Sequence, residues 1–224
     1  MSTENQIEGV KGLDSITEFY ENNKKNINIA GIGLILAAIG LWWYFNKIIP
    51  ARATEAQDSF FMAERYYQQD SLDKALNGDG INLGMIDIAD EYGSTKVGDM
   101  ANYYAGRILL QKDQYNEAIE YLDNVDFTDE FMAAQVITLK GDCYSELGEY
   151  KKAGDVYMKA ANKRDNKLSS PIALKKAAYA FEEANAYEDA IEALERIEDE
   201  YYNFSQGLSI DLRKAKLKAK MASQ

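Results

Sequence analysis

Residues 106–118 read GRILLQKDQYNEA, and residues 141–153 read GDCYSELGEYKKA. A glycine, a tyrosine nine positions later and an alanine three positions after that therefore recur after 35 residues. A period near ~34 residues with a small residue, an aromatic residue and an alanine in this order is typical of stacked helical hairpins. Such hairpins bury their apolar faces against one another and commonly bind other proteins. The pattern predicts an all-α repeat domain.

The pattern continues on both sides of these two segments in a weaker form. Tyr187 and Ala190 lie 37 residues after the second tyrosine and alanine, and Ala63 and Ala178 stand where the glycine would be. We predict an α-solenoid of about four hairpins. The first begins at residue 51, and the others cover about 97–125, 130–161 and 170–201, with an extra helix over 81–92. The repeat domain then occupies residues 50–205, and a basic capping helix occupies 206–224.

Small residues in this pattern have a packing role. Gly106 and Gly141 are expected where the two helices of a hairpin approach too closely for a side chain, and the recurring alanines would face them from the second helix. The recurring tyrosines would fill the space beside each turn. Ser94 or Thr95 is expected to cap one helix, and Ser170 followed by Pro171 another.

A second strong signal lies near the start of the chain. Residues 26–46 read NINIAGIGLILAAIGLWWYFN and carry no charge. A helix of this length spans roughly 31 Å, which matches a hydrocarbon core of roughly 30 Å. Two tryptophans, a tyrosine and a phenylalanine at its second end would lie at the level of the lipid headgroups. We predict a single transmembrane helix over 26–49, preceded by a short N-terminal cytoplasmic tail over 1–25, with Pro50 closing the span or bending the chain away.

Two alternatives to this anchor are a cleaved signal peptide and a buried core helix. A cleaved signal peptide is disfavoured because five acidic residues precede the apolar stretch and because that stretch is longer than usual. A buried core helix is disfavoured by its length without a charge. Lysine and arginine counts on the two sides are equal, so the charge rule gives only a slight preference for a cytoplasmic N-terminus, from the pair Lys24 and Lys25.

Composition limits the chemistry of the chain. The net charge is −12, which disfavours nucleic acid as a partner. Histidine is absent from the sequence, which removes the commonest general base and metal ligand. Cys143 is the one cysteine, so no internal disulfide can form, and we expect it to pack as a small apolar residue. Asp79 between two glycines is expected to form a turn rather than a calcium loop. We expect no enzyme activity, cofactor or metal site.

The repeated segments resemble tetratricopeptide repeats over about residues 56–205, although the early tryptophan and the closing proline of that family are absent. A short tail, one span and about four such repeats, together with DEYGSTKVGDMANYYAGRILLQKDQYNEAI over 90–119, resemble the YfgM family of ancillary subunits of the bacterial Sec translocon. This resemblance implies an inner-membrane protein with a cytoplasmic N-terminus and periplasmic repeats. It would lie beside SecYEG with a PpiD-like membrane-anchored chaperone and assist translocated chains.

Relatives with this fold bind partners along the first helix of each hairpin. Position by position, the resemblance implies a protein-binding groove lined by Phe60, Glu64, Tyr67, Tyr103, Arg107, Leu110, Thr138, Asp142, Lys175, Tyr179 and Glu182. Any helix exposes some such residues, so each position alone is weak evidence. Alternative functions are a tethered scaffold for cell-wall synthesis or outer-membrane assembly, and an adaptor facing the cytosol.

Overall fold

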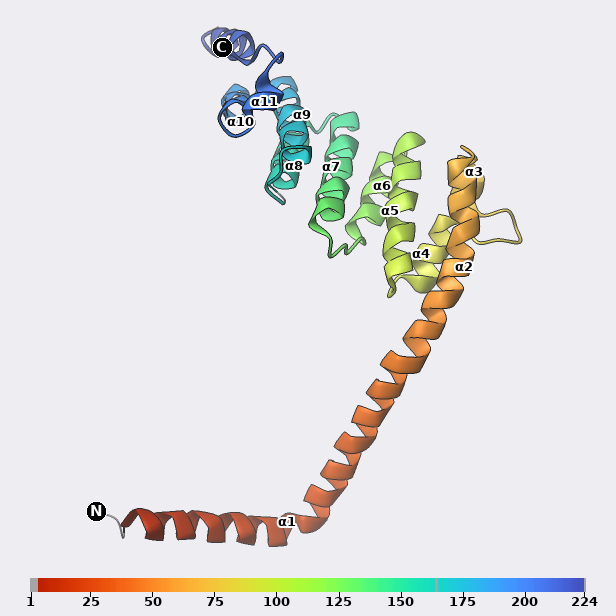
Figure 1. Cartoon of the computed structure of the whole chain (residues 1–224), viewed down its shortest axis with the longest axis vertical. Coiled ribbons are helices and arrows are strands. Elements are labelled where there is room, and N and C mark those ends of the chain that lie inside the picture. Colours follow the sequence, from red (N-terminus) through yellow and green to blue (C-terminus); the bar gives the residue numbers. More distant parts are fainter. Residues whose placement is uncertain (1–3, 164, 224) are drawn as a thin grey trace. The chain divides into compact units, whose positions relative to one another are not determined.

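The structure is a computed structural model that describes residues 4–163 and 165–223. Within these ranges every regular element is a helix, as Figure 1 shows, so the prediction of an all-α chain is confirmed. The chain divides into two compact units, residues 1–52 and 53–224.

The first unit is dominated by one long helix whose second half is apolar. Helix α1 (Glu4–Trp43) is followed by a turn of π-helix (Tyr44–Ile48) and by the start of α2 (Ile49–Gln68). The large apolar side chains between residues 29 and 45 are exposed, including Leu34 at 73%. Exposing such a side chain to water instead of burying it costs about 1.5–3 kcal/mol. In the described part of the chain this is the one helix long and apolar enough to cross a membrane, which is compatible with a single-pass membrane protein.

The helix does not end at Pro50. Proline has no N–H for the carbonyl four residues earlier, and its ring crowds that carbonyl. A π-turn lies directly before it, and the Ile49 N–H donates to the Tyr44 carbonyl oxygen five residues back. Such a turn is wider than an α-helical turn and changes which carbonyls are used. The helix therefore continues past Pro50, because the local π-turn accommodates the ring.

The second unit is a succession of helices joined by short turns. After α2 come α3 (Leu72–Asn77), α4 (Met85–Tyr92), α5 (Lys96–Gln111), α6 (Tyr115–Asp123), α7 (Glu130–Glu146), α8 (Tyr150–Lys163), α9 (Ser169–Glu183), α10 (Tyr187–Glu200), α11 (Tyr202–Ser205) and α12 (Ile210–Met221). The pairs α5 with α6, α7 with α8 and α9 with α10 lie in the segments predicted as the second, third and fourth hairpins. Each helix of these pairs contacts the next along the chain.

One backbone turn recurs after α2, α5, α7 and α9. Its central residue has a left-handed φ in all four places: Asp70 (57°), Asp113 (61°), Gly148 (76°) and Asn185 (57°). The next N–H donates to a carbonyl five residues back in every case, in the pairs Ser71 to Tyr66, Gln114 to Leu109, Glu149 to Tyr144 and Ala186 to Phe181. This is the Schellman pattern that ends helices. Asp, Asn and Gly tolerate the left-handed region best, which explains their presence.

Close approach of paired helices confirms the role predicted for the glycines. A Cβ on Gly106 would lie 2.6 Å from Leu122 Cγ on α6, and one on Gly141 would lie 2.5 Å from the Tyr157 ring on α8. The alanines predicted to face them, at positions 118, 153 and 190, are fully buried. The hydroxyl groups of Tyr115 and Tyr187 donate to the side chains of Asp113 and Asn185, so these rings lie beside the turns as predicted.

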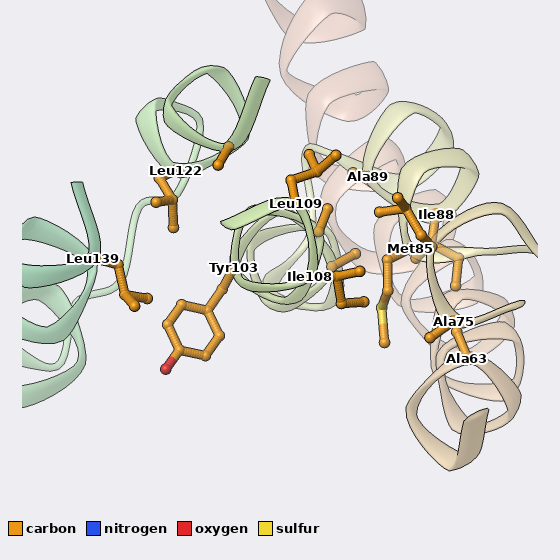
Figure 2. Close-up of a cluster of buried hydrophobic side chains, with 14 of the residues drawn as sticks. Ala63, Ala75, Met85, Ile88, Ala89, Tyr103, Ile108, Leu109, Leu122 and Leu139 are labelled. Carbon is orange, nitrogen blue, oxygen red and sulfur yellow. The ribbon is translucent and has the colours of Figure 1, made fainter. Parts of the chain in front are cut away.

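The first pair departs from the others because α3 has only six residues. The chain then forms a loop in which the Asp79 carboxylate accepts from the backbone N–H groups of Ile81 and Asn82 and from the Tyr66 hydroxyl. This confirms the predicted turn. Helix α4 follows, and Figure 2 shows its Met85 and Ile88 packed near α5. Both side chains are fully buried, so α4 supplies the core that a longer α3 would have provided.

At the other end, α12 packs mainly on α10. Leu217 and Ile210 are the buried residues of α12, at 0% and 5% exposure.

The pair of α9 and α10 begins differently from the prediction. Helix α9 starts at Ser169, and the Asn166 side chain accepts hydrogen bonds from the N–H groups of Leu168 and Ser169. Ser170 is buried inside the first turn, so the expected serine cap there is wrong.

Candidate protein-binding surface

The predicted groove residues are distributed over four helices of the second unit. Helix α2 carries Phe60, Glu64 and Tyr67; α5 carries Tyr103, Arg107 and Leu110; α7 carries Thr138 and Asp142; and α9 carries Lys175, Tyr179 and Glu182. Tyr103 is buried at 6% exposure and Tyr179 is exposed at 47%, whereas the others are half-buried. These residues fall into three groups with different surroundings.

The first group is an aromatic cluster between α2, α5 and the loop before α7. Tyr104 is its centre, with ring centroids 5.6 Å from Phe60, 5.0 Å from Tyr67 and 5.7 Å from Tyr103. Tyr103 also contacts Phe127 at 5.6 Å. All four pairs are edge-to-face, the arrangement that the ring quadrupoles favour. Burial raises the pKa of the Tyr104 hydroxyl, and nearby Glu64 raises it further. We call Phe60, Tyr67, Tyr103, Tyr104 and Phe127 the aromatic cluster.

Arg107 lies over this cluster. Its guanidinium carbon is 5.6 Å from the centroid of the Tyr67 ring and 5.5 Å from that of Tyr103. Among the described residues none forms an ion pair or a hydrogen bond with the Arg107 side chain. Glu64 lies one helical turn before Tyr67 on α2, and its carboxylate forms no ion pair with Arg107 in the described part of the chain. The two rings therefore hold the Arg107 guanidinium in place. Its N–H donors meet no acceptor among the described residues.

Two clefts lie at the ends of one partly buried face of α5. The first, of about 470 Å³, is lined by Met100 of α5 and by Phe127 and Met132 beyond it, and its charged lining residues are Lys96, Asp99, Asp126 and Asp129. The second, of about 460 Å³, brings Leu110 of α5 together with Asp142 of α7. Residues 100, 103, 107 and 110 recur every three or four positions, so they share one face of α5. This face thus has a cleft at each end and Arg107 between them.

The second group surrounds Asp142. Its carboxylate accepts hydrogen bonds from the Tyr157 hydroxyl and from the Lys176 ammonium, both at 2.6 Å. Burial and the adjacent carboxylate raise the pKa of Tyr157 well above its usual range. Asp142 therefore ties α7 to α8 and α9, and its paired carboxylate has less freedom to bind a partner than an open one. Thr138 donates to the Ala134 carbonyl in its own helix.

The third group is shared with α12. The Arg213 guanidinium lies 3.6 Å from the Tyr179 ring centroid and donates to Glu182 at 2.6 Å, and Lys220 donates to the same carboxylate at 2.8 Å. Burial raises the pKa of Glu182, but the hydrogen bonds from Lys220 and Arg213 outweigh this and lower it overall. Lys175 lies 6.0 Å from the Tyr179 ring centroid. The side chains of Tyr179 and Glu182 are thus in contact with α12.

Several residues of the surface were missed in the sequence. Tyr104 follows Tyr103 directly and could have been found as a second aromatic residue on the same helix. Phe127 and Met132 gave no comparable signal, because Phe127 lies in a loop whose path depends on tertiary contacts.

The remaining candidate for a reactive group, Cys143, is weak. Burial raises the pKa of the Cys143 thiol to about 11, which makes it a packing residue at neutral pH.

Comparison with known proteins gives one family match. Residues 87–180 match the family model described as a tetratricopeptide repeat-like domain. The match begins in α4 and ends in α9, so it includes α5 and Arg107. The search of curated proteins found no match. Domains of this description are generally repeat scaffolds without catalytic activity. The chain therefore contains a tetratricopeptide repeat-like domain, which is consistent with a protein that binds other proteins.

Proposed function

We propose that this chain is a membrane-anchored adaptor whose helical-repeat domain binds other proteins. The domain would be a solenoid of four hairpins over residues 50–205, with 206–224 as its cap. The observation that carries the proposal is the aromatic cluster with Arg107 above it, on the first helices of the repeats. Tyrosine and arginine are enriched among the residues that dominate protein-binding energy.

The geometry of this surface suits recognition. Its rings are fixed by edge-to-face contacts on two helices, so little side-chain freedom would be lost when a partner binds. Half-buried aromatic residues beside two clefts offer apolar contact area, and the polar tips of tyrosine and arginine provide hydrogen bonds. The adaptor would act by holding a partner near the membrane, which raises the effective concentration of whatever else is tethered there.

We further propose the site of action. Residues 1–25 would be a cytoplasmic tail, residues 26–49 a single span of the bacterial inner membrane, and the repeats periplasmic. The partners would be SecYEG and a PpiD-like chaperone, and the adaptor would assist translocated chains. Support comes from the apolar helix followed by a tetratricopeptide repeat-like domain, the arrangement on which the resemblance to the YfgM family rests.

The test is affinity purification of the full-length protein in mild detergent, with co-eluting chains identified by mass spectrometry. A matched variant carries Tyr67→Ala, which removes a ring from the aromatic cluster, and a control carries Phe61→Ala, an adjacent exposed ring. We expect SecYEG and a membrane-anchored chaperone with the parent and the control, and reduced recovery with Tyr67→Ala.

Other co-eluting machinery would contradict part of the proposal. Recovery of cell-wall or outer-membrane assembly proteins would support an adaptor function but contradict the association with the Sec translocon. A reporter fused after Gln224 that is active only in the cytosol would contradict the periplasmic placement. Equal recovery with Tyr67→Ala would show that the aromatic cluster is not the binding surface.

A further inference from the structure

We propose that Arg107 binds an aspartate or glutamate side chain of an extended partner segment whose apolar residue, three positions away, enters the cleft of Met100, Phe127 and Met132. This inference rests on the proposed function and names the chemistry of the segment that the surface selects.

The first argument is charge complementarity. The chain has a net charge of −12, and carboxylates pair with nine lysines and arginines in the described part of the second unit, including Lys112, Lys140, Lys176, Arg196 and Arg213. The Arg107 side chain is half-buried and has no such partner in the part of the chain that the structure describes. The Arg107 nitrogens are not buried and so remain open to an incoming group, and a carboxylate is the group that its planar fork fits best.

The second argument is pre-organisation. Tyr67 and Tyr103 hold the guanidinium between α2 and α5, so its direction is fixed by two rings rather than by its own flexible chain. A positioned arginine loses less freedom per hydrogen bond formed than a free one. The partner carboxylate would thus find donors already in place, next to apolar ring surface that lowers the local dielectric.

The third argument is spacing. Met100 and Arg107 are seven residues apart on one face of α5, or about 10 Å along the helix. An extended segment advances about 3.3 Å per residue, so three residues cover the same distance. Asp99, Asp126 and Asp129 outnumber the single cation Lys96 in the lining of the cleft at Met100, so the net negative charge of the cleft disfavours a second acidic side chain there. The surface therefore fits an apolar residue at one point and an acidic residue three positions from it.

The experiment uses the full-length protein in detergent micelles and a displayed library of extended segments. Matched sub-libraries carry Leu-x-x-Glu, Leu-x-x-Gln or Leu-x-x-Lys at their centre, and binding of individual peptides is measured by fluorescence anisotropy. We expect the glutamate form to bind about tenfold or more tighter than the glutamine form, since a hydrogen bond to a charged group contributes about 1.5–3 kcal/mol. The Leu-x-x-Lys form should bind most weakly.

Two variants with the same change in charge provide the control. Arg107→Gln should abolish the preference for glutamate over glutamine, whereas Arg65→Gln, at an exposed position of α2, should leave it unchanged. If the unmodified protein binds the glutamate and glutamine forms equally, the inference is wrong while the proposed function stands. If no sub-library is bound, the inference is wrong, and the affinity purification decides the proposed function separately. The comparison of peptides on the unmodified protein decides the matter even if Arg107→Gln fails to fold.

Discussion

At the scale of residues, single atoms decide how closely the helices of a pair approach. Gly141 packs against the Tyr157 ring, which cannot swing away because the ring is buried and its hydroxyl donates to Asp142. Glycine is therefore required at position 141 because the Tyr157 ring leaves no room for a side chain, and not because of its backbone conformation. Arg107, by contrast, is held by two rings, and its N–H donors meet no carboxylate among the described residues. They are therefore available to a partner.

The first prediction concerns Gly141→Ala. In an unhindered helix alanine is favoured over glycine by about 1 kcal/mol, but here overpacking against Tyr157 should destabilise the domain by about 1–3 kcal/mol. Chemical unfolding followed by circular dichroism measures the difference. The control is the same change in a Tyr157→Leu background, where the smaller side chain can retreat. An equal loss in both backgrounds would contradict the assigned clash.

The second prediction concerns Glu182 and pH. Its pKa is lowered in the folded state by Lys220 and Arg213, so its contribution to stability is present above the unfolded pKa, near ~4.3. The contribution is lost as the pH falls through the folded pKa. Glu182→Gln should cost about 1 kcal/mol at pH 7, and this cost should shrink as the pH falls through the folded pKa. Thermal melts over a series of falling pH values measure this. Glu183→Gln, at the exposed neighbouring position, should be silent throughout, and a penalty for Glu182→Gln that does not change with pH would contradict the ion-pair account.

At the scale of elements, one turn repeats and two elements depart from the pattern. Left-handed residues end α2, α5, α7 and α9 with the same hydrogen bond, so one turn geometry serves all four helices. Helix α3 is short, and α4 completes its core by packing Met85 and Ile88 (Figure 2). Helix α12 packs against α10 and holds Glu182 of α9, so it also limits access to that part of the surface.

The third prediction compares two leucines of α12. Leu217 is fully buried, whereas Leu212 on the same helix is 59% exposed. Leu217→Ala should destabilise the domain by about 2–5 kcal/mol, because it removes buried methyl groups and leaves a cavity. Leu212→Ala should change stability by no more than about 0.5 kcal/mol. Denaturant midpoints distinguish the two. Similar midpoints for both variants would mean that α12 does not cap the domain in solution.

At the scale of the whole molecule, the two compact units have opposite solvent requirements. The first exposes an apolar stretch between residues 29 and 45, and the second buries its apolar residues in two clusters of its own. Since neither cluster includes a residue before Ala56, the second unit has its own core. The exposed apolar stretch is compatible with a membrane span, which lipid or detergent would cover.

The fourth prediction follows from this division. A fragment of residues 53–224 should be soluble, helical by circular dichroism and cooperative in unfolding, whereas the full chain should sediment with membranes and require detergent for release. Carbonate extraction distinguishes an integral protein from a peripheral one. A full chain released by carbonate would contradict the anchor, and a fragment that does not unfold cooperatively would show that the repeats depend on the first unit.

The all-α class, the period of the helix pairs, the close-packed glycines and the apolar stretch could be predicted from the sequence, because each follows from local spacing and side-chain size. The continuation of the helix past Pro50 and the hydrogen bonds that Asn166 accepts at the start of α9 could not, because they depend on how neighbouring turns share hydrogen bonds. Tertiary contacts decide the surroundings of the predicted groove positions. Phe127 reaches Tyr103 from a loop, α12 covers Glu182, and Arg107 stacks without a carboxylate. Helical periodicity assigns a residue to a face, but contacts between distant elements decide what meets it there.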